Sequence, residues 1–385
     1  MLVKLRKSPC KARKIRPRKE KKLSGGKSMC TILDFFAGGG LVTEGMIGSF
    51  RTVWALDNSP KKAAVYIANH GDDHFKLDSI ENIKGADLPV ADAAWASFPC
   101  QDLSLAGKMG GLEGLRSGLV WQWLRIIDEM EKRPPLLIAE NVLGLVSAEG
   151  GKHYRAIHKA LQARGYKSGA VVLNAVNWLP QSRPRVFIIS VPKEFDCSNF
   201  STPFPGWAHP PAVIKAGAGL ADWVWWKIPQ PEEKPLPLST IIDETAPCDG
   251  ESKTRKNLAM IPANHQNQLR YEQANGFKVA AGYKRTRNGR QVLELRFDQV
   301  AGCLRTPNGG SSRQVLVLKK AGRLVTRLVS VRETARLMGA PETYSIPGSY
   351  NDGYKAMGDA VAVPVVRHLA KTLLRPLARA LNEKK

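Results

Sequence analysis

Residues 30–40 read CTILDFFAGGG, and this stretch decides the fold that the sequence predicts. A short apolar run ends at three glycines, and a helix-like segment follows as far as Met46. A strand that passes through such a turn into a helix is typical of a strand–helix–strand unit. The glycines let the backbone approach a ligand closely, and the helix start offers free N–H groups. The stretch therefore predicts an α/β fold with a ligand site at this turn.

Strand-like and helix-like segments alternate from this point to residue 191. The expected strands are residues 31–36, 52–57, 92–98, 135–140, 169–178 and 186–191. Helices are expected over residues 60–69, 119–131 and 153–164, the first with Ser59 as its N-cap and Pro60 in its first turn. This alternation predicts a doubly wound, mostly parallel sheet.

The chain is expected to contain four regions. Residues 1–28 form a basic, disordered arm, and residues 29–195 form the first part of the main α/β domain. Residues 196–324 are rich in Pro, Trp and Gly at first and then basic, with short β-like runs at 292–297 and 314–318, which predicts a smaller irregular β-containing domain. Residues 325–385 return to the main domain, with a capping box at 330–333 and a terminal helix over 363–382.

The net charge of +24 is the first indication of a partner. Twelve Lys and Arg residues against one Glu in the first 28 positions account for +11, so the remaining chain still carries +13. Such a surface favours a polyanionic partner, and nucleic acid is the expected one. No apolar run is long enough for a membrane span and no signal peptide is evident, so we expect a soluble, cytoplasmic protein.

The six cysteines are widely spread and form no CxxC pair, so neither a metal site nor a disulfide framework is expected. One of them, Cys100, follows a buried-looking strand in the sequence SFPCQDLS, where a ligand site of an open α/β sheet would lie. A glycine-rich polar segment follows it and is suited to a mobile lid. Cys100 is therefore the candidate nucleophile.

Carboxylates and arginines follow other strands at the same predicted edge. Asp57 ends the second strand and could accept hydrogen bonds from both hydroxyls of a ribose, while Asp78 could accept from an adenine amine. Glu140-Asn-Val142 ends a later strand, and Gln181-Ser-Arg-Pro-Arg185 precedes the last one. A nucleoside cofactor and an acid–thiol–arginine site fit this arrangement.

In this order the segments resemble the motifs of the DNA (cytosine-5) methyltransferase family, over residues 30–191 and 325–385. Residues 34–40 resemble its cofactor loop, Phe98-Pro-Cys-Gln101 its nucleophile motif and Glu140-Asn-Val142 its acid motif. Residues 181–185 resemble its Gln-x-Arg-x-Arg motif, and residues 327–341 the helix that supports the recognition domain. Residues 358–364 resemble its last motif, which closes the cofactor pocket. The resemblance implies a Rossmann-like S-adenosylmethionine-dependent domain with a smaller target recognition domain.

The resemblance also assigns residues to roles. The implied catalytic residues are Cys100, Glu140, Arg183 and Arg185. The implied residues for S-adenosyl-L-methionine, or its product S-adenosyl-L-homocysteine, are Phe36, Gly38, Gly40, Asp57, Asn58, Asp78, Ser79, Pro99, Leu119 and Asp359. The implied DNA-contacting residues are Gln101, Ser104, Arg116, Gln181, Asn308, Gly309, Gly310 and Arg313.

The mechanism implied by the resemblance is covalent catalysis on a flipped-out cytosine of double-stranded DNA. Cys100 would attack C6, Glu140 would hold N3 and the exocyclic amine, and C5 would take the methyl group. The implied protein acts as a monomer, and a cognate restriction endonuclease is a possible partner in the same cell.

Three departures from the family pattern affect the cofactor site. The last motif usually reads Gly-Asn, whereas this chain has Asp359 after its glycine. The ribose-binding acid is commonly Glu, whereas this chain has the shorter Asp57, followed by Asn58 where the family often has an aromatic residue.

Three alternatives stay open from the sequence. A branch of this family methylates cytosine in tRNA, although its members have a small middle region. A silent DNA-binding regulator on the same scaffold would be expected to lack Cys100 or Glu140, and both are present. A nicotinamide-dependent oxidoreductase would share the glycine turn but would have no use for the other motifs.

Overall fold

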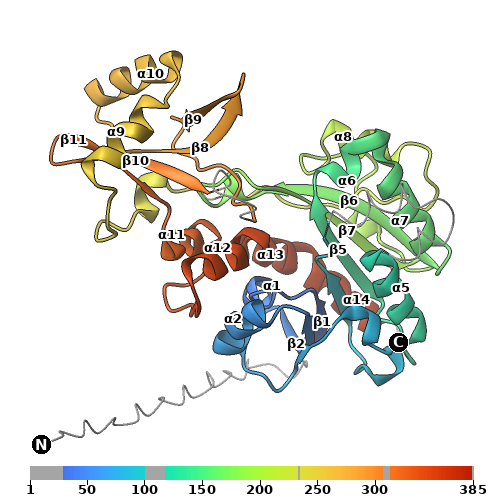
Figure 1. The fold of residues 1–385 in the computed structure, drawn as a ribbon. Coiled ribbons are helices and arrows are strands. Elements are labelled where there is room, and N and C mark those ends of the chain that lie inside the picture. Colours follow the sequence, from blue (N-terminus) through green and yellow to red (C-terminus); the bar gives the residue numbers. More distant parts are fainter. Residues whose placement is uncertain (1–28, 100–117, 233–234, 307–312, 384–385) are drawn as a thin grey trace, which may run out of the picture.

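The structure is a computed structural model that describes residues 29–99, 118–232, 235–306 and 313–383 (Figure 1). The predicted basic arm and the candidate nucleophile Cys100 lie outside the described residues.

A seven-stranded sheet forms the centre of the larger part of the molecule, with the strand order β3-β2-β1-β4-β5-β7-β6. Its strands are β1 (Cys30–Phe35), β2 (Phe50–Asp57), β3 (Phe75–Leu77), β4 (Ala93–Ala96), β5 (Leu136–Val142), β6 (Tyr166–Asn174) and β7 (Pro184–Pro192). The pairs β1/β2, β2/β3, β1/β4 and β4/β5 are parallel, and β7 is antiparallel to both of its neighbours. The predicted mostly parallel sheet is confirmed.

Helices cover both faces of this sheet, as Figure 1 shows. Successive side chains of a strand point to opposite faces of the sheet. In β1, Ile32 belongs to one apolar cluster and Leu33 to another, so both faces are apolar and need a helix layer. The cluster of Leu33 is completed by α5 (Leu119–Glu129) and α7 (Lys152–Gln162), and the cluster of Ile32 by α1 (Leu41–Met46), α13 (Val363–Leu369) and α14 (Arg375–Glu383). The doubly wound fold thus follows from strands that are apolar on both sides.

The remaining helices lie around the two sheets. They are α2 (Pro60–His70), α6 (Gly144–Ser147), α8 (Pro211–Gly217), α9 (Glu251–Ala259), α10 (Ala263–Ala274), α11 (Val331–Leu337) and α12 (Tyr350–Asp359). The Ser59 cap of α2 and the capping box of α11 are confirmed. A π-helical turn (Ala370–Leu374) separates α13 from α14, just before Pro376, which has no N–H for the regular helical bond.

A second, antiparallel sheet has the order β11-β10-β8-β9. Its strands are β8 (Val279–Arg287), β9 (Arg290–Arg296), β10 (Gln314–Lys320) and β11 (Arg323–Leu328). One face packs on α9 and α10, and the other face joins the core that the C-terminal helices share with the large sheet. Figure 1 shows the two sheets on either side of α11, α12 and α13.

The change of composition at residue 196 does not mark the start of this second sheet. The Pro- and Trp-rich segment packs on the β6–β7 edge of the large sheet, where Trp226 donates a hydrogen bond from Nε1 to the carbonyl oxygen of Ile189 at 3.1 Å. At the other end, β11 extends past residue 324 into the predicted return segment. The division into a catalytic and a recognition domain stays a prediction, and the second sheet occupies residues 279–328.

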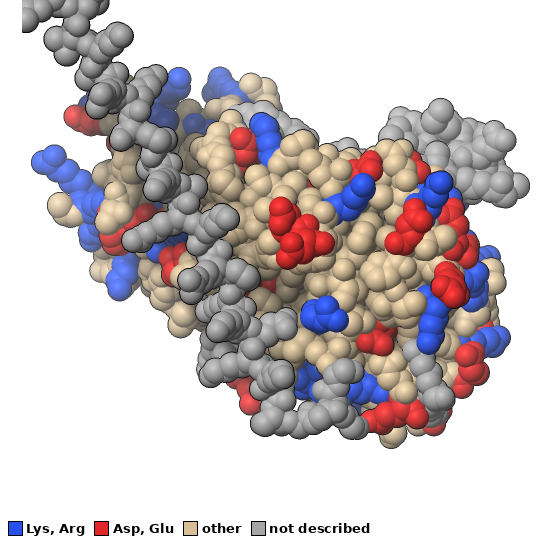
Figure 2. Space-filling model, turned by 90° about the horizontal axis from the view of Figure 1, so that it is seen from below, with Lys and Arg blue, Asp and Glu red and all other residues tan. Residues whose placement is uncertain are grey.

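Charge is mixed on the face seen in Figure 2, which shows the molecule from below. Acidic and basic side chains are interspersed there, so this face does not offer the uniformly positive surface that would attract a polyanion most strongly. In the described ranges, no helix combines the length and the apolar character that crossing a membrane demands.

Candidate active site

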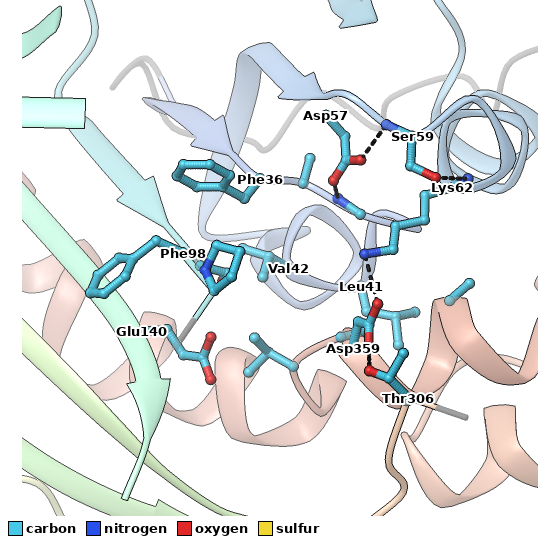
Figure 3. Close-up of a pocket in the computed structure, with 18 of the residues that line it drawn as sticks. Phe36, Leu41, Val42, Asp57, Ser59, Lys62, Phe98, Glu140, Thr306 and Asp359 are labelled. Carbon is cyan, nitrogen blue, oxygen red and sulfur yellow. Dashed lines mark hydrogen bonds and ion pairs between the residues drawn. The ribbon is translucent and has the colours of Figure 1, made fainter. Parts of the chain in front are cut away.

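A cavity of about 960 Å³ opens at the carboxyl ends of the parallel strands β1, β2, β4 and β5. Its walls come from the loops that follow these strands, from the start of β7, from residues 303–306 and from the end of α12. Figure 3 shows it between Glu140 on one side and Lys62 and Asp359 on the other. This is the edge at which an open α/β sheet binds its ligands.

Most of the predicted cofactor residues line this cavity. They are Phe36, Gly38, Asp57, Asn58, Asp78, Ser79, Pro99, Leu119 and Asp359. Gly40 is not among the residues that line it, and its contact with the cofactor stays a prediction. A Cβ on Gly40 would lie 2.6 Å from the His70 ring, so this glycine, with φ of 84°, allows close packing of α2.

Asp57 lies at the end of β2 and is held by two backbone N–H groups. Gly38 donates to Oδ2 and Ser59 donates to Oδ1, each at 2.9 Å. Each carboxylate oxygen has a second lone pair, so Asp57 can still accept two hydroxyl groups from a ligand. Gly38 adopts a φ of 58°, which turns its N–H toward Asp57 and which glycine adopts without strain.

Asp78 follows β3 and supplies a second acceptor. Asn82 donates to its Oδ1 at 2.9 Å and the N–H of Ser79 donates to the same oxygen at 2.8 Å. These two bonds lower the pKa of Asp78, the Asn82 bond most, so the group is a carboxylate at neutral pH.

Lys62 is a cavity residue that the sequence reasoning missed. Its Nζ lies 2.8 Å from Oδ2 of Asp359, and Thr306 donates to the other carboxylate oxygen of Asp359 (Figure 3). The chain thus contains a cation for the carboxylate that departs from the family pattern. The presence of Asp359 in place of the usual Asn could have indicated Lys62, because a partly buried carboxylate is usually paired with a cation.

Glu140 ends β5 and is buried, with 6% of the residue exposed. Its Oε1 lies 3.1 Å from Nε of Arg185. Burial raises the pKa of Glu140, while Arg185, Arg183 and a hydrogen bond from Ser97 oppose that rise. A buried acid with a raised pKa can share a proton with a ligand at neutral pH, which is the property that acid–base work requires.

Asn141 joins the acid to the segment before the candidate nucleophile. Its Nδ2 donates to the carbonyl oxygen of Phe98 at 2.9 Å, and its Oδ1 accepts from the N–H of Val142 at 2.9 Å. Phe98 and Pro99 directly precede Cys100 in the sequence. Asn141 therefore holds the backbone at Phe98, two residues before Cys100 in the sequence.

Two residues of the Gln-x-Arg-x-Arg motif are buried away from the cavity. Gln181 is fully buried, donates to the carbonyl oxygen of Leu337 at 2.6 Å and accepts from the N–H of Leu304 at 3.0 Å. This corrects the prediction that Gln181 contacts DNA, because both ends of its amide are occupied inside the protein.

Arg183 has a similar placement. Its guanidinium donates to the carbonyl oxygens of Leu304, Gly358 and Ala360 at 2.9, 2.8 and 2.5 Å. Burial lowers its pKa to about 10, which leaves it charged at neutral pH. A catalytic role of Arg183 stays a prediction, and the structure shows that its guanidinium links the segment at Leu304 to the end of α12 and the residue after it. Arg185 lines the cavity as expected.

The other predicted DNA residues are not tested by the structure. Gln101, Ser104, Arg116, Asn308, Gly309 and Gly310 lie, with Cys100, outside the described residues. Arg313 donates to Oδ1 of Asn351 at 2.5 Å, and its guanidinium lies over the ring of Tyr350.

The sequence model of C-5 cytosine-specific DNA methylases matches residues 30–375. The chain belongs to this family. It is therefore an enzyme of the cytosine-5 methyltransferase class, and the resemblance described above is confirmed. Glu140 and its ion-pair partner Arg185 both line the cavity and belong to the motifs that carried the resemblance.

Several Type II methyltransferases are similar to this methylase along most of its length. M.HpaII of Haemophilus parainfluenzae is 30% identical over 363 residues, covering 90% of this chain and 90% of its own. M.Bsp6I of Bacillus sp. (strain RFL6) is 28% identical over 356 residues, covering 91% of this chain and 100% of its own.

Solved structures share the fold of this methylase. The Dnmt2 methyltransferase of S. pombe matches with a TM-score of 0.59 at 18% identity, covering 91% of this chain and 99% of its own. A putative DNA modification methyltransferase encoded within an E. coli prophage matches with a TM-score of 0.52 at 17% identity, covering 92% and 100%. At these identities the likeness concerns the fold alone.

Proposed function

We propose that this methylase transfers the methyl group of S-adenosylmethionine to C5 of a flipped-out cytosine in duplex DNA, with Cys100 as the nucleophile. The observation that carries the proposal is the placement of Glu140, a buried acid paired with Arg185, in the same cavity as the nucleoside-type acceptors Asp57 and Asp78. One cavity can thus hold a cofactor and a base side by side.

The residues around the cavity fit S-adenosylmethionine. Asp57 has two free lone pairs for the ribose hydroxyls, and Asp78 offers a carboxylate for the adenine amine. A volume of about 960 Å³ lies at the upper end of the range for ligand pockets, which leaves room for a base beside the cofactor. The bound cofactor would supply an electrophilic methyl group.

In the proposed mechanism, the Cys100 thiolate forms a bond to C6 of cytosine. The electron pair of the C5–C6 double bond forms a C4–C5 double bond, and the pair of the C4–N3 double bond moves to N3, which takes a proton from Glu140. C5 is then the nucleophilic carbon of an enamine. C5 would then bond the methyl group as the methyl–sulfur bond breaks, which releases S-adenosylhomocysteine with that electron pair. C5 loses its proton to a base, the C5–C6 double bond re-forms as the Cys100 thiolate leaves, and N3 returns its proton to Glu140. Arg185 holds Glu140 in place for the N3 contact.

Duplex DNA is favoured as the substrate by two features of the chain. The net charge of +24 suits a polyanion, and the second sheet with α9 and α10 adds a large unit beside the cavity. Because the reacting carbon is inaccessible in stacked DNA, the cytosine must be extruded, at a cost of a few kcal/mol. A cognate endonuclease, a monomeric state and a cytoplasmic location stay predictions.

The test uses the full chain with S-adenosylmethionine labelled in the methyl group, and separately mixed-sequence duplex DNA and tRNA. We expect label in DNA, with 5-methylcytosine at one short motif by bisulfite sequencing, and none for Cys100→Ser. Label in tRNA alone would replace DNA by RNA as the substrate. Cofactor binding without transfer to either nucleic acid would refute the proposal and favour a silent DNA-binding role.

A further inference from the structure

A second cavity, of about 360 Å³, adjoins the first one and lies against the small sheet. Cys303 and Arg305 line both cavities, so the two lie next to each other. Ser182 and Pro184 of the catalytic part form one wall, and the strands β8 and β9 form the other. The second cavity therefore lies next to the one in which the target cytosine is proposed to bind.

Three arginines line the second cavity, namely Arg285, Arg296 and Arg305. Arg296 binds Asp298 through Nε and Nη2, whereas Arg285 is held through Nε alone. Arg285 projects from β8, and its Nε lies 3.0 Å from Oε2 of Glu294 on β9. Its guanidinium also lies 6.0 Å from the centre of the Tyr283 ring, over its face. Tyr283 is itself fixed, because its hydroxyl donates to the carbonyl oxygen of Cys303.

The strand register explains why these groups meet. Residues 283, 285 and 287 are two positions apart, so their side chains lie on the same face of β8. Glu294 of β9 lies directly opposite Tyr283. Arg285 is diagonal to Glu294 on that face. Since the ion pair engages Nε, the two terminal Nη atoms of Arg285 remain for a ligand, and no described residue accepts a hydrogen bond from them.

Arg287 binds the same carboxylate in a different position. Its Nε and Nη2 donate to the two oxygens of Glu294 at 2.6 and 3.2 Å, and its side chain is more exposed than that of Arg285. Arg287 lies at the hairpin end and does not line the second cavity. It is a natural control for Arg285, with the same charge and the same partner.

We infer that Arg285 is a specificity-determining residue that reads a guanine next to the target cytosine, through its two terminal N–H groups. Two parallel N–H donors match O6 and N7 of guanine in the major groove, and no other base edge there presents two acceptors to them. A guanidinium that is oriented before binding loses less side-chain entropy on contact. The inference rests on the proposed function, since it assumes that the protein methylates duplex DNA.

The test is methylation of a duplex library with randomised positions around one cytosine, followed by bisulfite sequencing. For the unaltered protein we expect a guanine requirement at one flanking position or more. Arg285→Ala should relax that requirement at one position by a factor on the order of 10 to 100, with the other positions unchanged. Arg285→Lys should relax it too, because it keeps the charge but lacks the paired donors.

The Arg287→Ala control should keep the full guanine requirement. Equal thermal midpoints and cofactor affinities for all variants, measured by calorimetry, exclude misfolding as a cause. A uniform loss of methylation over all sequences in Arg285→Ala would show a phosphate contact and overturn the inference, as would an unchanged profile. If the unaltered protein methylates no duplex, the proposed function falls and this inference falls with it.

Discussion

Lys62 Nζ lies 2.8 Å from Oδ2 of Asp359, and this ion pair joins the start of α2 to the end of α12 across the wall of the cofactor cavity. Both side chains are about four-fifths buried, so solvent screens the pair only in part. Asp359 also accepts from Thr306, which belongs to the segment leading to the small sheet. Three segments that are distant in the sequence therefore meet at one carboxylate.

The first prediction concerns this pair. Lys62→Gln should raise the dissociation constant of S-adenosylmethionine by about 3- to 10-fold, because an unpaired carboxylate would displace the end of α12. Asp359→Asn restores the residue that is usual in the family, and in that background Lys62→Gln should have little further effect. Isothermal titration of the four proteins measures the cycle, and additive effects would show that the pair does not matter for the cofactor.

The second prediction concerns Asn141 as a positioning residue. Asn141→Ala removes the hydrogen bond to the carbonyl oxygen of Phe98, so the segment before Cys100 loses its anchor. We expect kcat to fall by about 10-fold or more, in line with roughly 1–3 kcal/mol for a buried hydrogen bond, with little change in the KM for the cofactor. Asn275→Ala, on the exposed end of α10, serves as the control. A lower free energy of unfolding together with a raised KM for the cofactor would contradict this prediction and indicate a general packing role for Asn141.

The third prediction separates the two arginines of one motif. Arg183→Met should lower the free energy of unfolding by on the order of 3 kcal/mol, because three backbone carbonyls lose their donor. Arg185→Met should instead lower kcat strongly with a smaller effect on stability, since Arg185 pairs with Glu140 in the cavity. Denaturant unfolding and steady-state kinetics of both variants test this. The reverse pattern would contradict the assignment.

The fourth prediction concerns Asp34, which is fully buried at the end of β1. Burial raises its pKa from 3.8 to about 7, and only its Oδ2 has a partner, Thr43, among the described residues. Because the pKa of Asp34 is higher in the folded state, the folded protein binds this proton more tightly than the unfolded chain does. The stability that this proton binding adds is fully present below about pH 4 and is lost as the pH rises through about 7.

Asp34→Asn removes that dependence. The thermal midpoint of the variant minus that of the unaltered protein should therefore increase from pH 5 to pH 8. The exposed Asp87→Asn should give a difference that does not vary with pH in this way. A constant difference for Asp34→Asn as well would show that Asp34 does not titrate in this range.

The fold could be predicted wherever local signals and burial agreed. The capping box of α11 depends on Ser330 and Glu333 alone, and the parallel strands were evident from apolar runs between helices. The packing of residues 196–228 on the large sheet could not be predicted, since Trp226 finds its partner Ile189 only after folding. The Pro- and Trp-rich composition of this segment predicts that it belongs to the smaller domain, whereas in the structure it covers the edge of the large sheet.

The site could be predicted only in part, for a similar reason. Asp57 and Glu140 lie at the carboxyl ends of β2 and β5, and Arg185 lies at the start of the antiparallel strand β7, so the topology places all three at one edge. Gln181 and Arg183 share the same motif, but their burial depends on residues 304, 337 and 358, far away in the sequence. Lys62 was missed because a lysine in the first turn of a helix is usually a solvated side chain.

The central claim is that Cys100 bonds to C6 of the target cytosine. The most direct measurement uses duplex DNA with 5-fluorocytosine at the methylated position, because fluorine cannot leave C5 as the proton does and the adduct persists. With S-adenosylmethionine present, we expect a DNA–protein product resistant to denaturation, which peptide mass spectrometry assigns to Cys100 and which Cys100→Ser lacks. Methylation of normal DNA with no trapped product, or a product on Cys303, which lines the cavity, would contradict the account.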